Sequence, residues 1–256
     1  MSVSEGGRRV APSRGRRPVR RRRRVTVTGV LGELFITAGV GTLLFLGWQL
    51  WFNDLVIGNE LRDEAVQQSQ SWDRDANTAA HGTTEAPPVV GVPAHAAVFA
   101  NMIIPRFGAG WYKPIAEGTG TRDVLDKGEV GHYPTTQMPG ELGNFAVAAH
   151  RTSHGASFNG LNMLQAGDHI YIETADGWYS YVFRNLEYVH PNGVGVVAPV
   201  PESPGTVATD RILTMTSCNP LFSAQERIIA YSVFDRFIRR ADGPPDDIAA
   251  TVAGEV

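Results

Sequence analysis

The sequence predicts an all-β domain preceded by one N-terminal membrane helix. Two observations support this prediction. A long apolar run, residues 25–52, follows a basic N-terminal tail, and from about residue 96 onward short β-type runs alternate with turn residues. Many short strands at close spacing favour a barrel or a sandwich of about 145 residues over alternating strand–helix units.

The first 25 residues are strongly basic. They contain ten arginines and a single acid, Glu5, although the whole chain of 256 residues has a formal net charge of −3. Arginine blocks occur in nucleic-acid-binding arms, but beside an apolar span they are better explained by the positive-inside rule. We therefore expect residues 1–25 to be a cytoplasmic tail with no nucleic acid partner.

Residues 26–52 are the predicted membrane helix. Glu33 is the only charged residue in the run VTVTGVLGELFITAGVGTLLFLGWQLWF, which ends with the interfacial aromatics Trp48, Trp51 and Phe52. Roughly 20 apolar residues suffice to span a bilayer. A cleaved signal peptide would have a shorter apolar region followed by small residues, so we expect an uncleaved anchor with the rest of the chain outside the cell.

Residues 53–95 are expected to be an extracytoplasmic stalk and linker. The segment 53–76 has a helical but polar composition, in which apolar residues such as Leu61 are too sparse for a wide stripe. Residues 77–95 are rich in Ala, Thr, Gly and Pro, a composition typical of linkers. Together they would lift a folded domain off the membrane.

The predicted folded domain extends from residue 96 to residue 238. Its β-type runs are bounded by clusters of Gly, Pro, Asn and Asp, and they cover residues 97–105, 145–150, 169–174, 178–189, 212–218 and 227–234, with one short helix at 157–165. The remaining segment, residues 239–256, contains acids and prolines. We expect this segment to be a flexible C-terminal tail.

Cys218 is the only cysteine of the chain. Outside the cell an odd cysteine forms an intermolecular bridge or remains a reactive thiol, whereas in an apolar strand it is often an inert small side chain. It ends the run 212–218 and is followed by Asn-Pro, so the chain should leave the sheet at this point. A thiol in that position is accessible from a surface groove, which makes it a candidate nucleophile.

A nucleophilic cysteine needs a group that transfers protons and a donor that stabilises an oxyanion. His150 ends another apolar run beside a loop, the same placement as that of Cys218. Arg227 begins the strand that follows the cysteine. The two residues can share a sheet edge only if the intervening loop folds back, because an extended segment of that length would separate them by about 30 Å.

Four further residues are weaker candidates for a substrate groove. Tyr133, next to His132, precedes the strand that ends at His150, and the alternative for both is packing at the rim. Thr214 and Thr216 share strand parity with the cysteine and therefore point to the same face. Asn219 either orients His150 or caps the turn.

No metal or cofactor is expected. His154 lies four residues after His150, but the loop RTSHGAS is not a helix that would align the two rings. The sequence also offers no Cys, His and Asp cluster that completes four ligands. A loop histidine is the better interpretation of His154.

These motifs resemble those of the sortases, membrane-anchored cysteine transpeptidases of Gram-positive cell envelopes. The family carries TLxTC at its nucleophile, a histidine in a GHR-like setting and an arginine on the strand after the cysteine. The matching segments here are TMTSC (214–218), AAHR (148–151) and ERIIAYSVF (226–234), with Met215, Ser217 and Ala149 as departures. The segment CNP and the run GHYPTTQMPGELGNFAVAAHR most resemble class E sortases of high-GC actinobacteria.

The resemblance implies a closed sortase-type β-barrel of about eight strands with short helices over residues 96–238. It also implies roles for three residues: Cys218 as nucleophile, His150 as general acid and base, and Arg227 as oxyanion donor. The implied substrates are secreted proteins with C-terminal LAxTG- or LPxTG-like sorting signals. These would be cleaved between Thr and Gly and transferred to an amine of a peptidoglycan precursor.

The residues also leave two other classes of function to consider: another cysteine enzyme and a domain that binds without catalysis. An L,D-transpeptidase resembles this chain in the segment SHG, but Ala156 stands where that signature has a cysteine. A papain-like peptidase requires the cysteine before the histidine, which is the reverse of the order here. A membrane-tethered β-domain that binds wall peptides without chemistry is the alternative from a different class.

Overall fold

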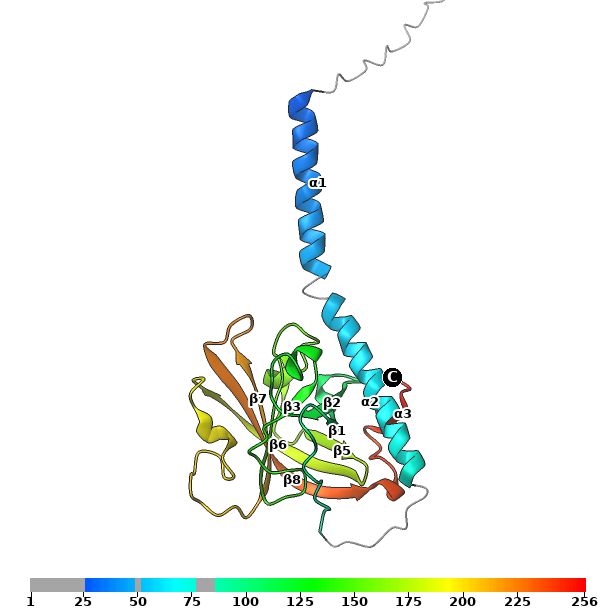
Figure 1. Ribbon diagram of the computed structural model, residues 1–256, viewed down its shortest axis with the longest axis vertical. Helices are drawn as coiled ribbons and strands as arrows, with labels where there is room; N and C mark the ends of the chain where they lie inside the picture. The colour runs from blue at the N-terminus through cyan, green and yellow to red at the C-terminus, as the bar shows by residue number, and fades with distance from the viewer. Residues whose placement is uncertain (1–25, 49–51, 77–85) are drawn as a thin grey trace, which may run out of the picture. The chain divides into compact units, whose positions relative to one another are not determined.

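The computed structural model describes residues 26–48, 52–76 and 86–256 (Figure 1). The basic tail, residues 1–25, lies outside the described residues, as do parts of the expected membrane helix and linker, residues 49–51 and 77–85. The chain divides into two compact units, residues 1–45 and 46–256, which are considered separately.

The first unit contains most of α1 (Val27–Gly47), a helix of 21 residues. It is long and apolar enough to cross a membrane, and none of its side chains is buried. At 1.5 Å per residue its length is about 32 Å, close to the thickness of a bilayer core. This confirms an apolar N-terminal helix as a candidate membrane span.

The second unit contains a closed β-barrel of eight strands in the order β1-β2-β3-β4-β7-β8-β6-β5 (Figure 1). Closure comes from antiparallel pairing of β5 with β1, while β2 with β3 and β4 with β7 are parallel pairs. The predicted closed barrel is therefore confirmed. The strands are β1 (Val98–Ile103), β2 (Tyr112–Glu117), β3 (Val130–His132), β4 (Gly143–Ala148), β5 (His169–Thr174), β6 (Gly177–Val189), β7 (Arg211–Asn219) and β8 (Glu226–Arg239).

Two of these strands, β2 and β3, were not predicted. All six residues of β2 are buried, including Lys113 and Glu117, so its sequence lacks the alternation of a half-exposed strand. Pro114 and the glycines before it suggest a turn instead. Strand β3 has only three residues, which is too short to produce a periodic pattern.

The barrel interior is filled by one apolar cluster to which nearly every strand contributes. On β4 and β7 the inward positions alternate along the strand, and Cys218 falls on the outward parity of β7. The inward residues on these two strands are Phe145, Val147, Leu213 and Met215. Short 3-10 helices connect the strands: η2 (Pro105–Phe107), η3 (Leu125–Lys127), η4 (Asn159–Met163), η5 (Val194–Val197) and η6 (Arg240–Asp242).

Helix α2 (Asn53–Ala76) packs against the barrel and is not a free stalk. Leu61, Ala65 and Ser69, spaced four residues apart, are all buried. The sequence failed to indicate this because the buried face is made of small and polar residues, so no wide apolar stripe exists. The described part of the expected linker also contacts the barrel, since the Tyr179 hydroxyl donates to the Pro88 carbonyl oxygen at 2.7 Å.

The C-terminal segment is also packed and not a flexible tail. It contains η6 and α3 (Ala249–Ala253), which lies beside α2 (Figure 1). Ile248 and Val252 are buried in a second apolar cluster with residues of α2, β1, β2, β5 and β6. Acids and prolines suggested disorder, but these two apolar side chains provide an anchor.

Candidate active site

The ends of β4 and β7 bring His150 and Cys218 to the same edge of the barrel. The two strands are parallel, and Ala148 lies opposite Thr216. Beyond this pair the Ser217 hydroxyl donates to the Ala149 carbonyl oxygen at 2.7 Å. The parallel pairing therefore carries both chain segments out of the barrel at one place, as their strand-end positions predicted.

Cys218 and Arg227 are direct neighbours across the antiparallel pair of β7 and β8. The loop between the strands folds back, as this pairing requires. The Arg227 guanidinium donates to the carbonyl oxygens of Ala224 and Glu226, at 3.0 and 2.9 Å. In this arrangement the side chain is held against the β7–β8 loop, beside the cysteine strand.

A cavity of about 530 Å³ lies at this edge of the barrel. The Cys218 thiol is free and half-buried, and it opens onto this cavity together with His150. Walls come from five parts of the chain: α2, the loop after β4, η4, the end of β7 and the β7–β8 loop. The lining residues are Asp54, His150, Arg151, Thr152, Ser153, Asn159, Cys218, Phe222, Ser223 and Ala224.

Asp126 on η3 is a member of the site that sequence reasoning missed. Its carboxylate Oδ1 lies 2.9 Å from the Nε2 atom of His150. Both side chains are partly exposed, at 33% and 25%. A carboxylate on one ring nitrogen orients the imidazole and determines which nitrogen is free for proton transfer.

His154 joins this pair, with its ring 5.2 Å from that of His150 and its Nδ1 atom 3.8 Å from Asp126. The ligand atoms of the three residues all lie within 4.8 Å of one another. Three such donors are a set that a divalent metal ion accepts. The sequence offered no third ligand because Asp126 approaches only through the fold.

Arg151 connects two walls of the cavity next to Cys218. The residue is 5% exposed, and its guanidinium donates to two segments: η4 and the end of β7. Burial lowers the pKa of Arg151, while the neighbouring Cys218 opposes this shift. The acceptors are Asn159 O at 3.1 Å, Asn162 Oδ1 at 2.8 Å, Cys218 O at 3.4 Å and Asn219 Oδ1 at 3.2 Å.

None of the four weaker candidates is among the residues that line the cavity. Tyr133 and Thr216 lie together, with 3.0 Å between their hydroxyl oxygens. Thr214 is fully buried, and Asn219 bonds Arg151 and Glu226.

His132 is also buried, and its Nδ1 atom lies 2.7 Å from the Glu117 carboxylate. The ring is therefore held beneath the surface by a partner on β2. Of the two neighbours considered from the sequence, only Tyr133 remains partly exposed.

Comparison with known proteins places this geometry in a family. Residues 102–234 match the family model described as the sortase domain. Sortase SrtE1 of Streptomyces coelicolor is 34% identical over 232 residues, which cover 88% of this chain and 62% of that protein. Sortase SrtE2 of the same organism is 30% identical over 230 residues, covering 86% of this chain and 87% of that protein.

A solved structure gives the same result. The crystal structure of Sortase E1 from Streptomyces coelicolor with a tripeptide in the active site has a TM-score of 0.56 and 36% identity, covering 60% of this chain and 97% of that one. The resemblance predicted from the motifs around Cys218, His150 and Arg227 is confirmed at the level of the family. The chain belongs to the sortases, which are cysteine transpeptidases, and the Streptomyces coelicolor relatives compared above are class E members of that family.

Proposed function

We propose that this sortase cleaves an LAxTG- or LPxTG-like sorting signal between Thr and Gly and joins the protein to an amine of the cell wall precursor. The observation that carries the proposal is that Cys218 and His150 open onto one cavity, with Arg227 directly across the strand pair from the cysteine. The tripeptide in the active site of the related sortase E1 supports a peptide as the substrate class.

In the first half-reaction the Cys218 thiolate attacks the carbonyl carbon of the threonine. The bond between Thr and Gly breaks, a thioester forms, and His150 donates a proton to the departing glycine amine. Because Asp126 occupies Nε2, proton exchange falls to the Nδ1 atom of His150. Arg227 donates to the developing oxyanion after its guanidinium turns away from the loop carbonyls.

In the second half-reaction an amine of the peptidoglycan precursor attacks the thioester. His150 takes a proton from this amine, the carbon–sulfur bond breaks, and a new amide forms while the Cys218 thiolate and the protonated His150 are restored. Cys218 and His150 line a cavity, and this partial enclosure favours the amine over water as acceptor.

We further propose that α1 anchors the enzyme, with the arginine-rich tail in the cytoplasm and the barrel outside the cell. The length and composition of α1 support the anchor, and the ten arginines before it support the orientation. Sortases act at the cell surface, which agrees with this arrangement.

The test detects the covalent acyl-enzyme and the amide product. The full chain in detergent is mixed with a peptide that contains LAxTG and with a small amine acceptor, and mass spectrometry follows the protein and the peptide. We expect an acyl-enzyme on Cys218 and an amide product, both absent for Cys218→Ala. Product formation by Cys218→Ala at the wild-type rate would refute the mechanism.

Arg227→Ala separates catalysis from binding in the same assay. An oxyanion donor acts mainly in the transition state. The acylation rate should therefore fall by roughly 10²- to 10³-fold, the range seen when a single oxyanion donor is removed, with little change in peptide affinity. A loss confined to peptide affinity would make Arg227 a docking residue.

A further inference from the structure

We propose that α2, the helix next to the membrane span, is part of the catalytic unit, and that its Asp54 is a positioning residue for His150. The inference rests on the proposed role of His150. Helix α2 lies outside the segment that matches the sortase domain, which begins at residue 102. The family match therefore does not cover this helix.

The first observation is a direct contact between α2 and the loop that follows His150. The Asp54 carboxylate accepts a hydrogen bond from the backbone N–H of Gly155 at 3.0 Å. Asp54 is half-buried and lines the same cavity as His150 and Cys218. The N-terminal end of α2 is thus a wall of the candidate active site.

The second observation is the conformation of that loop. Ser153, His154, Gly155 and Ala156 all have left-handed backbones, with φ of 65°, 49°, 80° and 42°. Non-glycine residues rarely adopt this conformation, and they keep it only when their surroundings enforce it. The loop closes where the N–H of Phe158 donates to the His150 carbonyl oxygen at 3.0 Å, so the loop is bonded directly to His150.

The third observation is close packing of α2 on both segments that hold His150. A Cβ atom on Gly155 would lie 2.9 Å from a methyl carbon of Ile57, and one on Gly128 would lie 2.7 Å from a methyl carbon of Leu61. Gly128 caps η3, the element that carries Asp126. Helix α2 therefore supports the loop after His150 and the helix that orients its ring.

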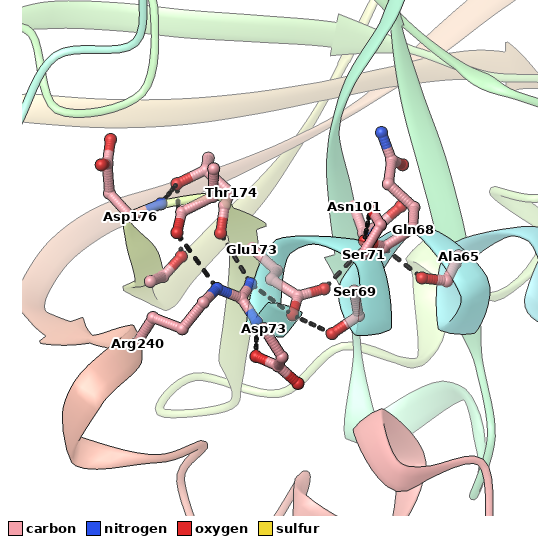
Figure 2. A network of polar contacts seen from close by, with 12 residues as sticks. Ala65, Gln68, Ser69, Ser71, Asp73, Asn101, Glu173, Thr174, Asp176 and Arg240 are labelled. Atoms are coloured by element: carbon pink, nitrogen blue, oxygen red, sulfur yellow. Dashed lines mark hydrogen bonds and ion pairs between the residues drawn. The ribbon is translucent and has the colours of Figure 1, made fainter. Parts of the chain in front are cut away.

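The far end of α2 is fixed to the barrel by a buried polar network (Figure 2). The Ser69 hydroxyl donates to the Glu173 carboxylate at 2.6 Å, and Arg240 bridges Glu173 and Asp73 at 2.8 and 2.6 Å. Residues 54, 58, 61, 65, 69 and 73 recur every three or four positions, so they lie on one face of the helix. One rigid element thus connects the network to the active site.

Asp54 also lies only seven residues after Gly47, the end of α1. The candidate membrane anchor and the active-site wall are therefore joined by one short segment of chain.

The experiment compares full-length variants in detergent with the LAxTG peptide and an amine. For Asp54→Ala we expect kcat to fall roughly ten- to hundredfold, the scale on which small misplacements act, while KM changes less than about twofold. Asp54→Asn should recover most of this loss, because its amide oxygen accepts the same bond from Gly155. Asp63→Ala is the matched control, since Asp63 is an exposed acid of the same helix.

Hydrogen exchange of residues 152–157 is the second measurement and does not depend on activity. Exchange should be faster in Asp54→Ala and unchanged in Asp54→Asn and Asp63→Ala. The inference is overturned if Asp54→Ala keeps wild-type kcat, if Asp63→Ala loses as much, or if Asp54→Asn is as slow as Asp54→Ala. Inactive wild-type protein would instead count against the proposed function, and the exchange data would still test the contact.

Discussion

At the scale of single residues, the imidazole of His150 illustrates how the fold completes a site. Asp126 accepts from one ring nitrogen, which leaves the other for proton exchange. In the proposed mechanism the carboxylate would also stabilise the positively charged ring that forms when His150 takes a proton from the incoming amine. In this respect the pair resembles the orienting acid of other nucleophile, base and acid arrangements.

Replacing Asp126 by Asn tests this role. The amide removes the negative charge but preserves the shape, so kcat should fall roughly tenfold or more, a part of the 10²–10⁴ that general acid–base catalysis contributes. Steady-state transpeptidation with peptide and amine measures the effect. Asp176→Asn, which alters an exposed acid in the turn between β5 and β6, is the control. Equal kcat for both variants would remove Asp126 from the mechanism.

The sequence predicted the residues that lie at strand ends but not those that support them. Cys218, His150 and Arg227 each occupy a recognisable boundary between an apolar run and a loop. Asp126 and Asp54 have no such signal, because they are separated in sequence by 24 residues from His150 and by 101 residues from Gly155. Contacts of that range depend on packing that a local pattern does not encode.

At the scale of elements, α2 shows why a polar helix is difficult to interpret from its sequence. Its docked face has Ala65 and Ser69 in the positions where a stripe of large apolar residues would be expected. Small side chains allow the helix to approach the barrel closely, and Ala65 offers its carbonyl oxygen to the Asn101 side chain at 3.3 Å. Polar contacts replace much of the apolar area.

The two ion pairs of Arg240 should contribute unequally to the free energy of unfolding. Removing the guanidinium in Arg240→Ala leaves the fully buried Glu173 without its charged partner, which should destabilise the protein by about 3–5 kcal/mol. Asp73 is 54% exposed, so Asp73→Ala should cost less than about 1 kcal/mol. Urea unfolding of the full chain measures both values. Similar costs for the two variants would contradict the assignment of Glu173 as the buried charge.

Lys113 connects β2 to α2 and predicts how stability depends on pH. Its ammonium donates to the Gly58 carbonyl oxygen at 2.9 Å, and burial lowers its pKa from 10.5 to about 8. Above pH 8 the unfolded chain still binds this proton and the folded chain does not, so stability should rise between pH 8 and 9.5, by at most about 2 kcal/mol.

Denaturation of wild type and Lys113→Met at pH 8 and 9.5 checks this expectation. The increase should disappear in Lys113→Met and persist in Lys127→Met, which removes an exposed lysine. Buried tyrosines such as Tyr112, whose pKa is raised by burial, act in the opposite direction only above pH 10. An equal increase in both variants would show that another group is responsible.

At the scale of the whole molecule, the pairing of distant segments determines where chemistry occurs. The strand pattern predicted most of the barrel, but it did not predict that β4 and β7 are parallel neighbours. That pairing joins segments about seventy residues apart and places His150 beside the cysteine strand. The barrel thus forms the site by topology, while α2 and the C-terminal segment cover one of its outer faces.

Orientation in the membrane is the corresponding prediction for the whole chain. With ten arginines before an apolar span, the N-terminus should stay in the cytoplasm and the barrel should be exported. A C-terminal alkaline phosphatase fusion, active only outside the cytoplasm, should be active, and a fusion to a fluorescent protein that folds only in the cytoplasm should be dark. Because positive charge sets the orientation, replacing most of these arginines by glutamine should weaken or reverse this pattern. A bright fluorescent fusion of the wild-type chain would place the barrel on the cytoplasmic side and contradict the proposed orientation.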